Sequence, residues 1–187
     1  GVGSQTKYVI ESLIETGRYK FICLGGAMKH VDYTPMEVDG WGKDWVIIPI
    51  DGYGNHEMIR SVLQKEKPDV LWFMTDPRFY SWLWEIENEI RALVPMVYYH
   101  VWDNFPIPMY NKVWYDSTDE VVAISKVTDK IVREASPDSY GGYIPHAVND
   151  SIFKKYTTAE EKEQVSRLRD NILSSSRNPE IINPNKK

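Results

Sequence analysis

The stretch MVYYHVWD, residues 96–103, is a short apolar run that ends in a histidine and an aspartate. It follows Pro95 and leads into a Pro-rich loop, which is typical of a buried β-strand. In open α/β sheets the carboxyl ends of the strands form the crevice in which ligands bind. His100 and Asp103 are therefore candidate functional residues, provided that the rest of the chain is also α/β.

The rest of the chain alternates between predicted strands and predicted helices. Apolar runs predict further strands at Tyr19–Leu24, Asp44–Ile50, Val70–Met74, Glu120–Ile124 and Tyr140–Pro145. Apolar residues recur at helical spacing within 8–15, 58–66, 82–93 and 125–135, and in the last of these Val127, Ile131, Val132 and Ala135 form the expected buried stripe. The strand runs are continuous rather than alternating, so both sheet faces should be covered. The sequence predicts an α/β fold: a Rossmann-like, doubly wound, mostly parallel sheet with helices on both faces.

The two ends of the chain differ from its middle. GVGSQT, residues 1–6, has the composition of a strand-to-helix turn, although no strand precedes it. At the other end, 157–187 contains one helix with a thin apolar stripe and then Ser-, Asn- and Pro-rich linker chemistry. We therefore expect a Rossmann-like domain at 1–156 whose first strand lies upstream. A helix and linker at 157–187 would lead to a further domain.

Composition argues against several classes of function. The chain has 27 acidic and 22 basic residues and a formal net charge of -5, so it lacks the positive field that attracts nucleic acid. No apolar stretch approaches the ~20 residues of a transmembrane helix, and no signal pattern is visible, so we expect a cytoplasmic protein. The single cysteine, Cys23, excludes a disulfide within the chain. Zinc-ligand spacing, a Walker loop and a G-x-S-x-G elbow are all missing from the sequence.

Four segments resemble one enzyme family. IPHAVNDSIFK, residues 144–154, resembles the I-P-[NH]-G-V-D-x-x-x-F segment that ends the N-terminal domain of GT-B glycosyltransferases, above all the retaining enzymes of family 4. VVAISK, residues 121–126, is similar to the family's V-x-A-x-S strand and turn, and 97–103 resembles its V-x-x-x-H-D strand end. The opening GVG resembles the glycine loop after the family's first strand. Ala147 and Asn149 depart from the glycine and aspartate of the family pattern.

The resemblance implies the N-terminal half of a GT-B fold, with the acceptor bound mainly by this half and a UDP- or GDP-linked sugar mainly by the other. Transfer would proceed with retention and without a metal ion or other cofactor. His100 would hydrogen-bond the donor sugar, and Asp103 would orient an acceptor hydroxyl or hold His100. Backbone N–H groups at Gly1, Gly3 and Ser4 would face the donor diphosphate, since a helix N-terminus favours anions.

Candidates for acceptor binding come from the aromatic residues of the middle of the chain. Trp102, Phe105 and Tyr110 lie in a predicted loop, where aromatic rings can stack on sugars. Asp76 follows another predicted strand and could reach the same crevice. Each has a structural alternative, because aromatic residues commonly pack in a core and an aspartate before proline commonly caps a turn. The acceptor would be a glycan, a lipid-linked sugar or a protein.

Two other classes of function remain open from the sequence. One is a non-catalytic module that binds carbohydrate or a protein through an aromatic crevice. The other is one half of a sugar-nucleotide epimerase, which shares a doubly wound nucleotide-binding domain. Fold alone does not decide among these, because this architecture hosts many functions.

Overall fold

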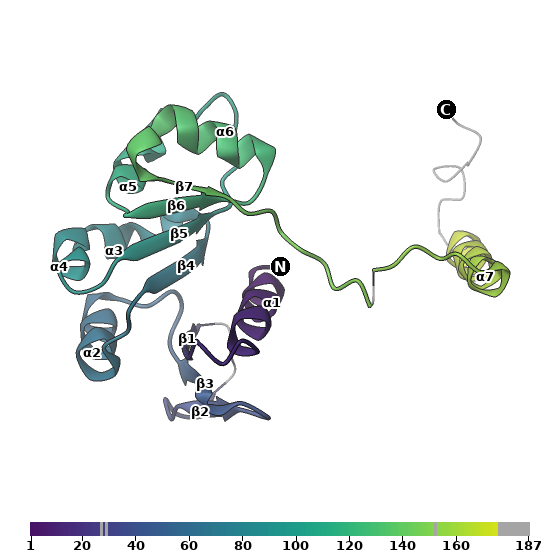
Figure 1. Cartoon of the computed structure of the whole chain (residues 1–187), viewed down its shortest axis with the longest axis horizontal. Coiled ribbons are helices and arrows are strands. Elements are labelled where there is room, and N and C mark those ends of the chain that lie inside the picture. Colours follow the sequence, from purple (N-terminus) through teal and green to yellow (C-terminus); the bar gives the residue numbers. More distant parts are fainter. Residues whose placement is uncertain (27, 29, 152, 176–187) are drawn as a thin grey trace. The chain divides into compact units, whose positions relative to one another are not determined.

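The structure is a computed structural model that describes residues 1–26, 28, 30–151 and 153–175. The chain divides into two compact units, Gly1–Ala147 and Val148–Lys187 (Figure 1). The first unit contains all of the described strands and most of the helices. The second unit contains one long helix.

The first unit begins with helix α1 and ends with strand β7. Its described elements are α1 (Val2–Ile14), β1 (Phe21–Gly25), β2 (Met36–Val38), β3 (Gly42–Pro49), α2 (His56–Glu66), β4 (Leu71–Thr75), η1 (Pro77–Tyr80), α3 (Ser81–Trp84), α4 (Glu87–Arg91), β5 (Met96–His100), η2 (Met109–Asn111), α5 (Lys112–Asp116), β6 (Glu120–Ala123), α6 (Lys126–Ala135), η3 (Pro137–Ser139) and β7 (Tyr140–Tyr143), where η denotes a 3-10 helix.

The central feature is a four-stranded parallel sheet in the order β4-β5-β6-β7. β5, the strand that carries the MVYYH run, lies inside this sheet, and Met96 and Tyr98 are fully buried. Helices flank the sheet (Figure 1). The α/β class and the parallel sheet predicted from the continuous apolar runs are therefore confirmed, and the arrangement is compatible with a Rossmann-like fold.

A second, three-stranded sheet has the order β1-β3-β2. β1 is parallel to β3, whereas β2 is antiparallel to it. The prediction of one continuous sheet is therefore wrong for the described residues, because β1 and β4 are not paired with each other. The sequence also did not predict β2, since Met36-Glu37-Val38 is too short to form a recognisable apolar run.

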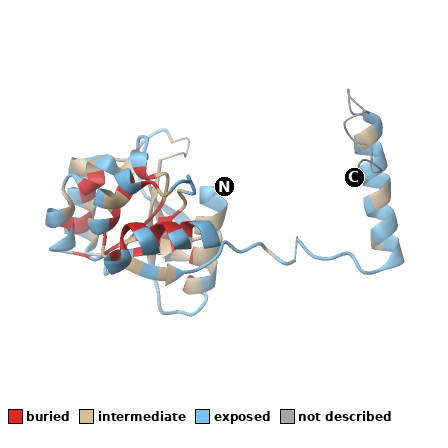
Figure 2. Cartoon of the chain, turned by 90° about the horizontal axis from the view of Figure 1, so that it is seen from above, coloured by how far each residue is buried: buried red, intermediate tan, exposed pale blue. Residues whose placement is uncertain are grey.

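Two cores hold the first unit together. The larger one joins one face of β4–β7 to the helices through residues such as Ile59 of α2, Phe73 of β4 and Ile131 of α6. The smaller one joins Ile10 and Ile14 of α1 to the β1-β3-β2 sheet. Figure 2 shows buried residues concentrated on the strands and on the inner sides of the helices.

Several predicted helix boundaries agree with the structure and others shift. Ser125 is the predicted N-cap of α6, and its Oγ accepts a hydrogen bond of 3.1 Å from the Thr128 N–H. The predicted single helix over 82–93 is instead two short helices, α3 and α4. α1 begins at Val2, so the opening GVGS forms the first turn of a helix rather than a separate turn.

The second unit is built around α7 (Ala159–Ser175). The capping box at its start is present: the Glu161 N–H donates to Thr158 Oγ1 at 3.2 Å, and Glu161 Oε2 accepts from the Thr158 N–H at 3.2 Å. Backbone N–H groups of Thr158 and Thr157 lower the pKa of Glu161 to about 2. The stripe Val165, Leu168 and Ile172 is exposed. The predicted linker from residue 176 onward lies outside the described residues.

Asp119 provides a test of how the amino ends of the strands are held. Its carboxylate accepts two hydrogen bonds: one of 2.8 Å from the N–H of fully buried Met96 and one of 3.0 Å from Arg91 Nε. We expect Asp119→Ala to lower the free energy of unfolding by about 2 kcal/mol, because the buried N–H loses its partner. Urea denaturation measures this change. Glu57→Ala is the matched control: its exposed pair with Arg60 should contribute under about 0.5 kcal/mol. Equal effects of the two variants would contradict the assignment.

Candidate functional site

The carboxyl ends of β4 and β5 lie at the same edge of the parallel sheet, since their register pairs Thr75 with His100. Besides Asp103, the segments that follow these strands carry four sequence candidates and one arginine that was not among the candidates. We call this set the carboxyl-end rim; it comprises Asp76, Arg78, Trp102, Phe105 and Tyr110.

Asp76 and Arg78 form the charged part of the carboxyl-end rim. Asp76 Oδ1 caps η1 by accepting a hydrogen bond of 2.9 Å from the Arg78 N–H. The Asp76 carboxylate also accepts hydrogen bonds from the Arg78 guanidinium, at 2.6 Å from Nη2 and 3.0 Å from Nε. These hydrogen bonds lower the pKa of Asp76, so it is ionised at neutral pH. The turn role expected as the structural alternative for Asp76 is therefore present. Its position at the strand end is also compatible with ligand binding.

Arg78 connects the β4 loop to the β5 loop. Its guanidinium carbon lies 4.9 Å from the centre of the Trp102 ring, within cation–π range. About two thirds of the Arg78 side chain is exposed. The sequence offered only a weak signal for Arg78, namely its place two residues after Asp76 at a strand end, because single arginines are common in surface loops.

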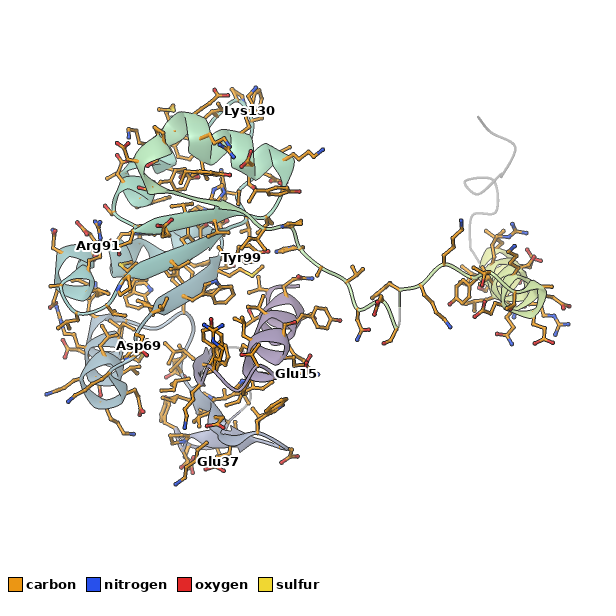
Figure 3. The ribbon with its side chains drawn as sticks, viewed as in Figure 1. Glu15, Glu37, Asp69, Arg91, Tyr99 and Lys130 are labelled. Carbon is orange, nitrogen blue, oxygen red and sulfur yellow. The ribbon has the colours of Figure 1, made fainter. Side chains whose placement is uncertain are left out.

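Phe105 and Tyr110 form the exposed aromatic part of the carboxyl-end rim, with 60% and 62% of their surfaces accessible. The Tyr110 hydroxyl accepts 3.2 Å from Asn104 Nδ2, and Lys130 Nζ of α6 lies 5.5 Å from the Phe105 ring centre (Figure 3). A shallow hollow of about 440 Å³ is lined by Trp102, Asp103, Asn104 and Phe105. The hollow offers ring faces and a carboxylate to a ligand.

His100 lies in the core and has no exposed surface. Its Nε2 lies 2.7 Å from the Tyr115 hydroxyl, within hydrogen-bonding distance. The same hydroxyl accepts a hydrogen bond of 3.2 Å from Asn111 Nδ2. His100 Nδ1 and Asn111 Oδ1 are buried, and neither has a hydrogen-bond partner among the described residues. Burial lowers the pKa of His100 to about 3, so the ring is neutral at physiological pH.

The structure does not bring His100 and Asp103 together. Asp103 is exposed in the loop, whereas His100 contacts Tyr115 and Asn111 in the interior. In this conformation His100 offers no surface to a ligand. Its expected contact with a donor sugar, and the expected orienting role of Asp103, stay predictions that require His100 to become exposed.

Gly1, Gly3 and Ser4 are exposed at the start of α1. Gln5 Nε2 donates a hydrogen bond of 2.8 Å to the carbonyl of Ala147, which follows the carboxyl end of β7. This bond holds the start of α1 at the carboxyl-end side of the β4–β7 sheet. The segment that follows β7 is fixed in turn by Tyr99 of β5, which is labelled in Figure 3. The Tyr99 hydroxyl donates a hydrogen bond of 2.8 Å to the Ile144 carbonyl. The first N–H groups of α1 thus lie at the same edge of the sheet as the carboxyl-end rim.

A further aromatic pair was missed by the sequence analysis. The rings of Tyr53, after β3, and Phe79, after β4, stack with centres 4.2 Å apart and planes inclined by 9°. Both side chains remain almost half exposed. The pair joins the loops of the two sheets, a contact that no local sequence pattern could indicate.

Comparisons with family models, with curated proteins and with solved structures gave no match for this chain. Within the described ranges, no group of three or more histidine, cysteine or acidic side chains is arranged to hold a metal ion. None of the helices described is long and apolar enough to span a membrane.

Proposed function

We propose that this chain is the acceptor-binding half of a retaining GT-B glycosyltransferase that uses a UDP- or GDP-linked sugar. The observation that supports this most is the carboxyl-end rim, which combines exposed rings with charged groups at the carboxyl ends of parallel strands. Ligands of open α/β sheets bind at this edge. Sugars present apolar C–H faces that stack on aromatic rings and hydroxyls that hydrogen-bond to charged side chains.

The carboxyl-end rim, Asp103 and the first turn of α1 each have a role in this proposal. Phe105 and Tyr110 stack on the acceptor sugar, while the Asp76–Arg78 pair holds Trp102 beside them. Asp103, free of ion pairs among the described residues, orients the acceptor hydroxyl that attacks the donor. The first turn of α1, with Gly1, Gly3 and Ser4, faces the donor diphosphate, because the N-terminus of a helix favours an anion.

The remaining catalytic groups belong to the other half of the proposed enzyme. Departure of a nucleoside diphosphate requires aligned donors and positive charges around the leaving group. The half described here contributes orientation of the acceptor and a helix terminus, without the main donor-binding surface. This chain alone is therefore folded but inactive in sugar transfer.

We expect Phe105→Ala to weaken binding of the acceptor glycan by the full-length protein about fivefold. Loss of one stacked ring removes roughly 1 kcal/mol, and 1.4 kcal/mol corresponds to a factor of ten. Titration calorimetry with glycans selected on an array measures the change. Phe153→Ala is the matched control, since Phe153 is also exposed but lies in the second unit. Unchanged affinity in Phe105→Ala, or equal losses in both variants, would argue against the carboxyl-end rim as the acceptor site.

The buried position of His100 favours a second candidate function, a non-catalytic carbohydrate-binding module. A module needs the exposed rings of the carboxyl-end rim but no group that reaches a donor. Hydrolysis and transfer assays of the full-length protein with a panel of UDP- and GDP-sugars separate the two functions. Turnover supports the transferase. Glycan binding without turnover and without nucleotide-sugar binding supports the module.

A further inference from the structure

The two sheets of the first unit each end in an unpaired strand. Among the described residues, β4 pairs only with β5, and β1 pairs only with β3. Figure 1 shows the strands in one row, in the order β7, β6, β5, β4, β1, β3 and β2, so that the free edges of β4 and β1 are neighbours in the row. Two free edges therefore lie inside the row of strands rather than at its ends.

Neither free edge carries the features that protect an exposed edge strand. β4 reads LWFMT and β1 reads FICLG, without a charge or a proline. Within β4, Phe73 and Met74 are only 6% and 4% exposed. Such sequences are typical of strands that are paired on both sides.

The backbone of β4 has hydrogen-bonding groups left over at this edge. Alternate residues of a strand direct their N–H and C=O groups to the same side. The Leu71 N–H donates a hydrogen bond of 3.0 Å to the carbonyl of Pro95, the residue before β5. The backbone N–H and C=O groups of Phe73 and Thr75 therefore also face β5. Trp72 and Met74 therefore face the free edge, where the N–H groups of both lack a partner among the described residues. The strand is thus ready to pair with another.

Helices cover the junction of the two sheets from opposite faces (Figure 1). On one face, Ile59 and Leu63 of α2 share a core with Phe73 of β4 and Leu24 of β1. On the other, α1 packs on the β1-β3-β2 sheet and also contacts β4. A strand in the junction would be buried on both faces, which requires an apolar sequence.

The direction of α1 identifies which polypeptide would fill the junction. α1 starts at the carboxyl-end side of β4–β7 and then leads directly into β1, as the second half of a β-α-β crossover does. A crossover helix is preceded by a strand parallel to the one that follows it, usually its neighbour in the sheet. The strand that completes this crossover comes from the polypeptide immediately before α1.

We propose that an apolar strand of this same protein, directly N-terminal to α1, inserts parallel between β1 and β4 and joins the two sheets into one. The inserted strand accepts and donates hydrogen bonds at Trp72 and Met74 on one side and at β1 on the other. Its carboxyl end then passes into the first turn of α1. The proposal stands on the sheet edges and does not depend on the proposed function.

Hydrogen exchange of residues 1–187 and of the full-length gene product tests this pairing. We expect the amides of Trp72 and Met74 to exchange at least roughly 100-fold more slowly in the longer chain, because buried strand amides exchange only through larger openings. The amides of Phe73 and Tyr98, which face neighbours in the existing sheet, serve as controls. Equal exchange at Trp72 and Met74 in both chains would overturn the proposal. Protection in residues 1–187 together with a dimeric mass would replace it with a strand from a second copy.

A disulfide trap provides an independent measurement in the full-length protein. Neighbouring strands lie about 4.8 Å apart, so an inserted strand separates β1 from β4 by about 10 Å. Disulfides need Cα atoms within about 7 Å. Cys23 of β1 and a cysteine from Met74→Cys or Trp72→Cys should therefore stay reduced under oxidant. Rapid formation of either disulfide would show that β1 and β4 pair directly, and would overturn the proposal.

Discussion

His100→Ala is expected to lower the free energy of unfolding by roughly 3 kcal/mol, the largest effect among the substitutions considered. The change leaves a cavity where a fully buried ring was, and it removes the partner of the Tyr115 hydroxyl at 2.7 Å. Chemical denaturation measures the loss. His100→Gln should restore part of it, because an amide can again bond to the hydroxyl.

A double-mutant cycle separates the structural role of His100 from a catalytic one. Tyr115→Phe removes the hydroxyl that joins His100 to Asn111, so the two substitutions should be strongly non-additive in stability. If His100→Ala left stability within about 0.5 kcal/mol of the native protein but abolished sugar transfer by the full-length protein, the buried position would not represent the working state. The donor-contact role implied by the family resemblance would then be favoured.

Acid should destabilise this protein before its carboxylates titrate. Burial lowers the pKa of His100 from 6.5 to about 3 in the folded state. Above pH 6.5 the ring is neutral in both states and contributes nothing to the pH dependence. Below that pH the unfolded chain binds a proton that the folded chain excludes, so stability falls as pH decreases. The slope approaches about 1.4 kcal/mol per pH unit, which gives a loss of about 3 kcal/mol by pH 4.

Denaturation curves at pH 7, 6, 5 and 4 measure this loss, with His100→Gln as the control that lacks the titrating group. Burial also lowers the pKa of His146, which contributes in the same direction and remains in the control. Below about pH 4, protonation of carboxylates whose folded pKa is lowered, such as Asp76 and Asp129, adds a further loss. Identical pH profiles of the native protein and His100→Gln between pH 6.5 and 5 would contradict a buried neutral ring.

Local sequence patterns predicted much of the fold because the strands are buried on both faces. β4, β5 and β6 appear as continuous apolar runs, and Ser125 carries a recognisable cap. The predicted stripe of α6 was wrong at Val127, which is 47% exposed. The buried positions are Thr128, Ile131, Val132 and Ala135, a spacing in which a threonine takes the place expected for valine. The split between β1 and β4 is a matter of pairing, which apolar runs do not encode.

The candidate site was predictable at the level of loops but not of side-chain environments. Asp76, Trp102, Phe105 and Tyr110 lie in the loops after β4 and β5, as their places at predicted strand ends indicated. The burial of His100 could not be predicted, because it depends on Tyr115 of α5, which lies 15 residues further along the chain. Arg78 and the Tyr53–Phe79 stack likewise depend on contacts between loops.

The Asp76–Arg78 pair has a consequence for the charge of any ligand that binds at the carboxyl-end rim. Its two opposite charges lie within 2.6 Å of each other beside the aromatic rings, so their fields largely cancel beyond the pair. This pair then contributes little long-range attraction for an ionised ligand, and little of its field remains for dissolved salt to screen. Under the proposed function, we therefore expect an uncharged acceptor saccharide, recognised through ring faces and hydroxyls, whose affinity depends little on the charges of this pair.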